Sequence, residues 1–267
     1  HQMIEAFETG KDVHSLTGAL ISGKSPEEVK DEDKKDIKCP LGDGSKTWRF
    51  WGKKANHGLN YDLGYKNFAL HYEIPERDGK FIVDSYHNAY PGVRNGFHAF
   101  VKKCLAKSRT LENLMGRKTI FLDGWGDNLL KEAYSCIPQG TTGDVINERG
   151  LLFIYYNQNQ FRPIKLLNQV HDSIGFQISL ETPWTEHARM LLEIKKELEK
   201  PLTTHYGDSF IIPADLTIGC TLFKEEHGEE LKAGDISDDP DTFADMLKES
   251  YNRCFDKTYG AEKCQDA

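Results

Sequence analysis

Two apolar runs separated by a short polar turn place the strongest constraint on how this chain folds. The first, IKLLNQV at residues 164–170, is apolar enough for a strand, and the second, IGFQISL at 174–180, alternates apolar with small or polar side chains. A period of two is typical of a β-strand with one buried face. The buried face is expected to consist of Ile174, Phe176, Ile178 and Leu180. Residues 171–173, His-Asp-Ser, would then form the tight turn of an antiparallel hairpin.

The rest of the sequence predicts mainly helices. They are expected over residues 3–22, 47–72 and 185–202. A further pair should be separated at Pro91 and Gly92, and another helix should break at Pro138, because proline disfavours helical geometry in the residue before it. A second hairpin is expected to turn at Met115 and Gly116. This mixture lacks a regular alternation of strand and helix, so it indicates an α+β fold and not a doubly wound parallel sheet.

The composition indicates a protein of the cytoplasm without a membrane segment. Of the 267 residues 38% are apolar, and the mean hydropathy is −0.59. No run approaches the roughly 18 apolar residues of a transmembrane helix, and the first residues lack the pattern of a secretory signal. The six cysteines are scattered without paired spacing, so neither a zinc site nor a disulfide framework is expected.

Acidic side chains are concentrated at the end of the chain. Residues 224–267 carry 13 acidic and 6 basic side chains, and therefore nearly all of the net charge of −8. The remainder is close to neutral, which is compatible with a local basic face for nucleic acid. Two polar segments, 23–46 and 225–267, are open to two interpretations: each binds a partner, or each is a loosely packed surface segment. A short helix is expected in the first, and the second is expected to be partly helical between residues 240 and 259.

A window of mixed basic and aromatic residues, RFWGKKANHGLNYDLG at 49–64, is informative about binding. Arg49, Lys53, His57 and Tyr61 fall within 120° of one another on a helix. Two cations, a histidine and a phenol on one face suit a polyphosphate joined to an aromatic base. A solvated basic face is the alternative. Gly58 in this helix predicts a close approach by another group.

The turn between the two strands has two interpretations as well. Asp and Ser are ordinary turn residues. Alternatively, the hairpin holds Asp172 rigidly as a carboxylate ligand for Mg²⁺, which takes only one or two ligands from protein and the rest from phosphates and water.

Several windows, in their order along the chain, resemble the DNA polymerases of family A, the bacterial DNA polymerase I type that includes many phage replicative enzymes. The R-x3-K-x7-Y pattern of the family is matched by Arg49, Lys53 and Tyr61, and QVHDS at 169–173 resembles its palm motif Q-V-H-D-E. GKDVHSLTGALISG and EAYSCIPQGTTGDVI also have counterparts in the family. The resemblance covers residues 3–224.

The resemblance implies a polymerase right-hand fold, with helical fingers and an antiparallel palm sheet flanked by helices. Fingers are expected over residues 1–90, including a nucleotide-binding helix at about 47–72. A palm portion is expected over 91–224, and an acidic C-terminal extension over 225–267.

The resemblance also implies a role for each matching residue. Asp172 would hold metal as one of two palm carboxylates for two Mg²⁺ ions. The incoming dNTP would be contacted by His14, Arg49, Lys53, His57 and Tyr61, with Lys53 also able to protonate the pyrophosphate. Primer–template DNA would be contacted by Lys131, Ser135, Gln139 and His171. The activity implied is DNA-directed DNA synthesis.

The sequence departs from the family pattern in ways that affect this expectation. The 267 residues contain no D-Y-S-x2-E motif, which carries the second essential Asp of the family. His57 stands where Phe or Tyr is usual, which predicts altered handling of dideoxynucleotides. Ser173 replaces a Glu, Asp62 a Gly and Ser135 an Asn. Segment 23–46 is longer than usual.

Three functions are compatible with these features. The first is a DNA polymerase completed by an N-terminal fragment or chain, as in a split polymerase, or a processed or truncated product, in the cytoplasm of a bacterium or of a phage-infected host. The second is a non-catalytic remnant that binds primer–template or a replication partner, for which the acidic tail is a candidate surface. The third is a metal-dependent hydrolase built on His171 and Asp172, which lacks further matching ligands.

Overall fold

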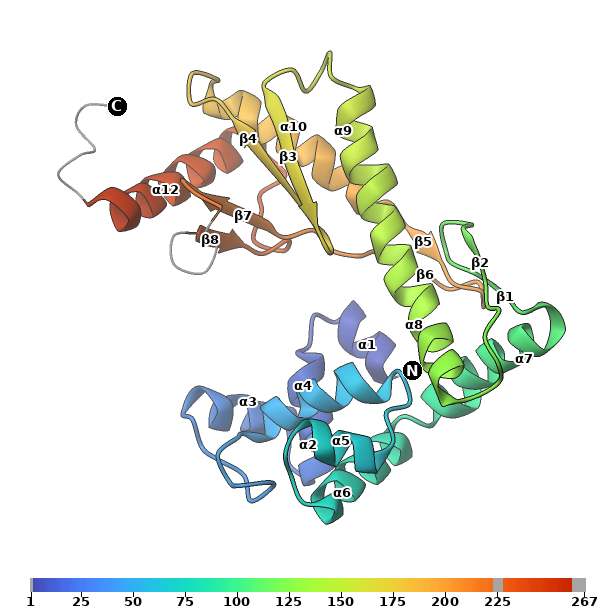
Figure 1. Cartoon of the computed structure of the whole chain (residues 1–267). Coiled ribbons are helices and arrows are strands. Elements are labelled where there is room, and N and C mark those ends of the chain that lie inside the picture. The colour runs from blue at the N-terminus through green and yellow to red at the C-terminus, as the bar shows by residue number, and fades with distance from the viewer. Residues whose placement is uncertain (1, 223–227, 261–267) are drawn as a thin grey trace. The chain divides into compact units, whose positions relative to one another are not determined.

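The computed structural model describes residues 2–222 and 228–260, which form two compact units (Figure 1). The first unit comprises the residues up to Glu112 and Lys118–Pro138, and the second comprises Asn113–Arg117 and the residues from Gln139 onward. Parts of the expected acidic extension, at 225–227 and 261–267, lie outside the described residues, as does Cys264. Within the described ranges, no helix is long and apolar enough to cross a membrane.

The first unit is mainly helical. Its helical segments are α1 (Gln2–Glu8), α2 (Val13–Ser22), α3 (Pro26–Lys34), α4 (Trp48–Leu59), α5 (Tyr65–His71), α6 (Glu76–Ala89), the π-helical η1 (Val93–His98) and α7 (Ala99–Ser108). Strands β1 (Thr110–Glu112) and β2 (Lys118–Ile120) form a hairpin that turns through Gly116, as predicted. The core lies between α4, α5 and α6, where Trp51, Phe68 and Tyr86 are almost completely buried.

Helix α8 (Asp127–Asp144) begins in the first unit and ends in the second, which continues with η2 (Val145–Leu151). Further helices among the described residues of the second unit are α9 (Leu152–Tyr156), α10 (Trp184–Leu198) and α12 (Pro240–Tyr259). In the part of this unit that the structure describes, the strands form three antiparallel pairs: β3 (Ile164–Val170) with β4 (Ser173–Ile178), β5 (Leu202–Thr203) with β6 (Ser209–Phe210), and β7 (Leu216–Gly219) with β8 (Gly228–Leu231).

The hairpin predicted around the His-Asp-Ser segment is present. Val170 pairs with Ser173, so the turn consists of His171 and Asp172 alone. Side chains of Phe176 and Ile178 pack on the cluster formed by α9 and α10. The expectation for Leu180 is wrong, because the strand ends at Ile178 and Leu180 is 54% exposed.

Four of the expected helices differ from the structure. The helix expected over 185–202 ends at Leu198, and Leu202 begins the strand β5. Residues 3–22 form two helices, because Gly10 adopts a φ of +64° and Asp12 caps the start of α2. Residues 47–72 also form two, separated by a turn in which Asp62 has a φ of +58°. The break expected at Pro138 is absent. Helix α8 continues through Pro138, although proline removes one of its backbone hydrogen bonds.

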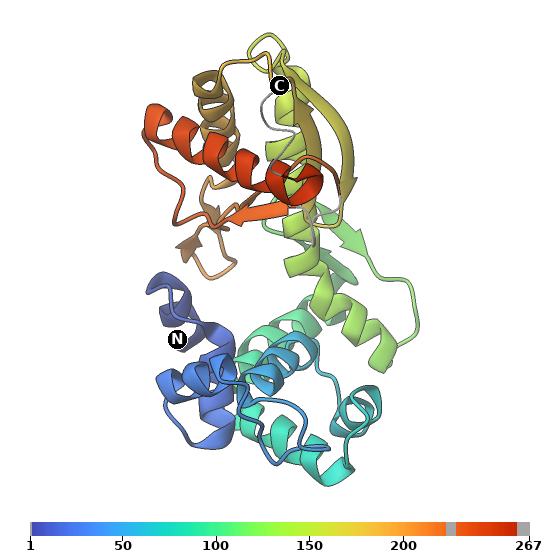
Figure 2. The same cartoon turned by 90° about the vertical axis from the view of Figure 1, so that its left-hand side faces the viewer.

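Both segments that were open to two interpretations contain helices that pack. Helix α3 starts at a capping box formed by Ser25 and Glu28, and its Val29 is completely buried. Helix α12 occupies the whole of the stretch that was expected to be partly helical, and it lies against α10 in two views (Figures 1 and 2). Neither helix is loosely packed, and partner binding by either segment stays a prediction.

Candidate functional site

Helices α2 and α4 approach each other at the level of the backbone. A Cβ atom on Gly52 would lie 2.2 Å from the His14 carbonyl oxygen and 2.6 Å from the Gly18 nitrogen. A Cβ on Gly18 would lie 2.7 Å from the Trp48 carbonyl oxygen. Only glycine is compatible with such contacts, since there is no room for a side chain. This close packing places His14 of α2 beside the polar face of α4.

A groove of about 450 Å³ follows that face in the first unit. Four of the five residues predicted to bind a nucleotide line it: His14, Lys53, His57 and Tyr61. Three further lining residues were not predicted: Lys54, Asn56 and Asn60. The helical spacing in the sequence identified the face, but nothing in it identified the asparagines that α4 and its C-terminus contribute.

The orientation of His14 is fixed by Asn56. The Asn56 amide nitrogen lies 3.2 Å from His14 Nδ1 and 3.3 Å from the Val13 carbonyl oxygen, and its amide oxygen accepts a hydrogen bond from Thr17. Because an amide nitrogen donates, His14 Nδ1 accepts, and the neutral ring carries its proton on Nε2. Burial lowers the pKa of His14, with Arg49 and Lys53 acting in the same direction against Asp12. This lowering of the pKa favours the neutral form of the ring.

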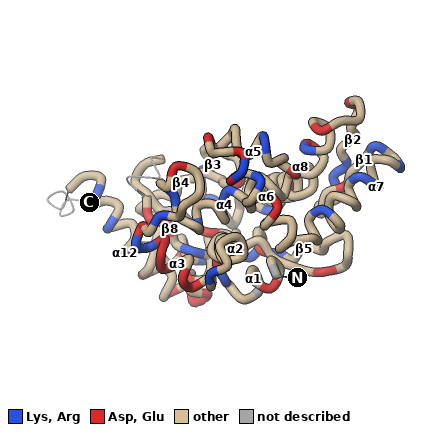
Figure 3. Tube along the Cα trace, turned by 90° about the horizontal axis from the view of Figure 1, so that it is seen from below, with Lys and Arg blue, Asp and Glu red and all other residues tan. Residues whose placement is uncertain are grey.

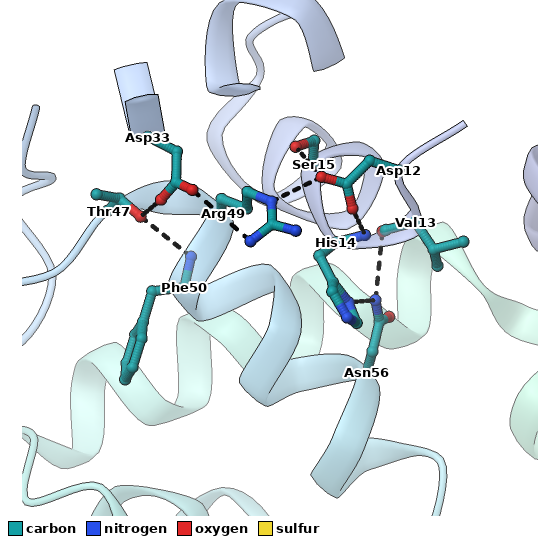
Figure 4. A network of polar contacts seen from close by, with 9 residues as sticks. All are labelled: Asp12, Val13, His14, Ser15, Asp33, Thr47, Arg49, Phe50 and Asn56. Atoms are coloured by element: carbon teal, nitrogen blue, oxygen red, sulfur yellow. Dashed lines mark hydrogen bonds and ion pairs between the residues drawn. The ribbon is translucent and has the colours of Figure 1, made fainter. Parts of the chain in front are cut away.

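Arg49, the fifth predicted residue, points to the side of the groove and contacts two carboxylates (Figure 4). Its Nε lies 2.6 Å from Asp12 Oδ2, and its Nη1 lies 3.6 Å from Asp33 Oδ2. Burial opposes ionisation of Asp12, but hydrogen bonds from Arg49, Ser15 and the His14 backbone hold its pKa at about 2. Sequence reasoning did not identify either acidic partner.

The C-terminal end of α4 is held by contacts within the first unit. Arg94 donates from Nε and Nη2 to Asp62 Oδ1, at 2.9 and 2.8 Å. His98 is 1% exposed, and its Nε2 lies 2.7 Å from the Asn60 carbonyl oxygen. Leu63 is the group that approaches Gly58, as the sequence predicted for some group. A Cβ atom on Gly58 would lie 3.2 Å from Leu63 Cδ2.

The β3–β4 turn of the second unit presents exposed ionisable groups. His171 has a φ of +52°, and both it and Asp172 are exposed at the tip. Ser173 donates to the Val170 carbonyl oxygen at 2.8 Å, which closes the turn. No group of three or more His, Cys, Asp or Glu suited to a metal ion occurs in residues 2–222 and 228–260. Asp172 offers carboxylate oxygens of the kind that Mg²⁺ prefers, but one carboxylate alone does not complete the coordination of the ion.

The predicted DNA contacts on α8 fall on both sides of the division between units. Lys131 and Ser135 belong to the first unit and are half-buried, and Ser135 donates to the Glu132 carbonyl oxygen at 2.9 Å. Gln139 belongs to the second unit and is exposed.

Comparisons with known proteins agree on one family. Residues 1–220 match the sequence model of DNA polymerase family A. DNA polymerase I of Helicobacter pylori (strain J99) is 26% identical over 235 residues, which are 86% of this chain and 22% of that protein. DNA polymerase I of Aquifex aeolicus is 27% identical over 210 residues, 76% of this chain and 31% of that protein. The chain thus spans between about a fifth and a third of the length of these relatives.

Among solved structures, the polymerase domain of Pol1 from M. smegmatis, in complex with DNA primer–template and dNTP, has a similar fold. The TM-score is 0.59 at 22% identity, over 74% of this chain and 33% of that one. The likeness confirms the expected fold class, a right-hand polymerase fold of helices and small antiparallel sheets.

Proposed function

Because the chain belongs to DNA polymerase family A, we propose that it takes part in template-directed DNA synthesis, in which a nucleotidyl group passes from a dNTP to a primer 3′-hydroxyl. The observation that carries this proposal is the groove along α4, where His14, Lys53, His57 and Tyr61 meet. Phosphoryl transfer depends mainly on positioning and charge stabilisation, and this groove offers groups for both.

Each side chain of the groove has a task suited to its chemistry. Lys53 is exposed and bears three N–H donors, so it binds the triphosphate and can give a proton to the leaving pyrophosphate. His14 donates from Nε2 to a phosphate oxygen. Arg49 offers its guanidinium from beside the groove. His57 and Tyr61, whose rings lie 6.5 Å apart, face the sugar and the templating position.

The remaining assignments extend the proposal to DNA and to the subdomains. His171 contacts the primer terminus, and the α8 residues Lys131, Ser135 and Gln139 contact the minor groove. We assign residues 1–90 to the fingers, 91–224 to the palm and 225–267 to an extension. The solved Pol1 domain binds primer–template and dNTP, which supports these partners for the present chain.

Asp172 is the carboxylate that this chain contributes to metal binding. Two Mg²⁺ ions, when bound, would neutralise charge on the attacking and leaving oxygens. The 267 residues lack the D-Y-S-x2-E motif, so the second carboxylate comes from an N-terminal fragment or from another chain. The role of Asp172 is to present its oxygens from a rigid turn at the primer terminus.

A primer-extension assay tests the proposal. The chain is mixed with a primer–template, dNTPs and Mg²⁺, with and without a polymerase fragment from the same source that carries D-Y-S-x2-E. We expect extension only on mixing, and its loss in Asp172→Asn, while primer–template binding measured by fluorescence anisotropy is retained. Full extension by the Asp172→Asn mixture would contradict the assignment.

A non-catalytic binding module is the second candidate. It is favoured by the absence, among the described residues, of any group of three or more His, Cys, Asp or Glu side chains that could hold a metal together with Asp172. Primer–template binding by the chain, combined with no extension in any mixture, would select this alternative.

A further inference from the structure

Two carboxylates hold the guanidinium of Arg49, and they differ in how firmly they do so (Figure 4). Asp12 is the N-cap of α2: it accepts from the His14 backbone nitrogen at 3.0 Å and from Ser15 at 2.8 Å. Its 2.6 Å contact with Arg49 Nε is a charge-assisted hydrogen bond. Asp12 therefore sets the direction of the arginine.

Asp33 makes a looser contact. Its Oδ2 lies 3.6 Å from Arg49 Nη1, which is beyond the range of a good hydrogen bond. Its other oxygen, Oδ1, accepts a hydrogen bond from Thr47, whose hydroxyl also caps the start of α4. The carboxylate of Asp33 is therefore oriented by Thr47 and is only electrostatically attracted to Arg49.

The position of Asp33 is well determined by the segment that carries it. Helix α3 has a capping box and a proline at its first turn, and its buried Val29 lies against α2 at Gly18. Its sequence, PEEVKDEDK, is mostly acidic (Figure 3). Among the acidic residues of α3, Asp33 is the one whose carboxylate lies within ion-pairing distance of Arg49.

We propose that Asp33 is a positioning residue that acts through Arg49, serving as an exchangeable counter-ion that an incoming triphosphate displaces from Nη1. This rests on the proposed function, because Arg49 is taken to bind the triphosphate. A carboxylate at this point repels a polyanion and competes with it for the same donor. Segment 23–46 thereby lowers the affinity of the site for nucleotide, and hence tunes the concentration at which it fills.

The substitution Asp33→Asn separates charge from structure. The amide oxygen of the introduced asparagine can still accept from Thr47, so the cap of α4 is retained, while the negative charge beside Arg49 is lost. Asp31→Asn is the matched control, because it removes the same charge from an exposed position two residues away on α3. Thermal unfolding of each full-length variant, followed by circular dichroism, verifies that the fold is intact.

Binding is measured on the full chain with two probes, a fluorescently labelled dATP and inorganic tripolyphosphate, both with Mg²⁺. We expect Asp33→Asn to lower Kd for both probes by about twofold to fivefold, as for a partly exposed charge, and Asp31→Asn to change Kd by less than about 1.5-fold. The gain should shrink as salt is raised. The lowering of Kd by Asp33→Asn should also disappear when Arg49 is replaced by Ala. A merely structural effect of the substitution would persist in that background.

Each other outcome has a definite meaning. If the wild type binds the probes and Asp33→Asn binds them equally well or more weakly, the role of Asp33 is overturned. The proposed function would still stand in that case. Failure of both wild type and Asp33→Asn to bind either probe would overturn the nucleotide site itself, and the inference with it. If Asp33→Asn binds the probes and the wild type does not, the inference is supported in its strongest form.

Discussion

Asp62 adopts a backbone conformation that disfavours most side chains. Its φ of +58° lies in the left-handed region, where aspartate is tolerated better than most residues. Two hydrogen bonds from Arg94 hold its carboxylate. The ion pair and the tolerance of aspartate together account for a non-glycine residue directly after Tyr61, at the end of the groove.

Replacing Asp62 separates these two contributions. Asp62→Ala should lower the free energy of unfolding by about 1–2 kcal/mol, because it removes a partly exposed ion pair and keeps an unfavourable φ. Asp62→Gly should cost less, since glycine adopts this φ without strain. Urea unfolding of the full chain measures both. Equal losses in the two variants would show that the backbone angle contributes nothing.

His87 on α6 makes stability depend on pH. Both of its ring nitrogens are buried, and neither has a hydrogen-bond partner among the described residues. Burial, assisted by Arg94, lowers its pKa from 6.5 to about 4. The unfolded chain therefore binds the proton more readily, and stability is lost as the pH falls from about 6.5 toward 4.

Removing the titrating group should flatten that dependence. Between pH 7 and pH 5, His87→Leu should lose about 1 kcal/mol less stability than the wild type, allowing for partial solvent screening. Urea titrations at the two pH values give the comparison. Parallel losses in the variant and the wild type would exclude His87 as a source of the pH dependence.

At the scale of elements, the contact of α2 with α4 assembles the groove. Gly52→Ala should separate the two helices, because its Cβ would meet backbone atoms that cannot rotate away. We expect a loss of at least about 2 kcal/mol and weaker binding of labelled dATP. Gly58→Ala in the same helix is the control, since it meets the flexible end of Leu63 at 3.2 Å. Similar losses in both would contradict the backbone contact.

Elements with a clear period were predictable from the sequence, and their ends were not. The alternation in 174–178 located a strand, and the spacing of Lys53, His57 and Tyr61 located the groove, because both patterns are local. The break at Asp62 depends on Arg94, which is 32 residues away. The pairing of Arg49 with Asp33 likewise needs α3 to fold back onto α4, and no spacing rule encodes that.

At the scale of the whole chain, helix α12 packs into the second unit. Helix α12 follows the region that matches the family, residues 1–220. It buries Phe243, Ala244 and Leu247 against the α10 surface around Ala188. Arg253 also forks onto Glu229 of β8, at 2.6 to 3.1 Å. Helix α12 is therefore part of the core of this unit.

Leu247→Ala tests whether α12 stabilises the second unit in this way. The side chain is completely buried, so its truncation should destabilise the second unit by about 2–4 kcal/mol. Lys248→Ala, at an exposed position one residue later, should have little effect. Hydrogen exchange resolved by peptides should speed up in α10 and leave α4 unchanged, because α4 belongs to the other compact unit. Faster exchange in α4 to the same extent would show that the two units unfold as one cooperative body. No change in α10 would show that its packing does not depend on the extension.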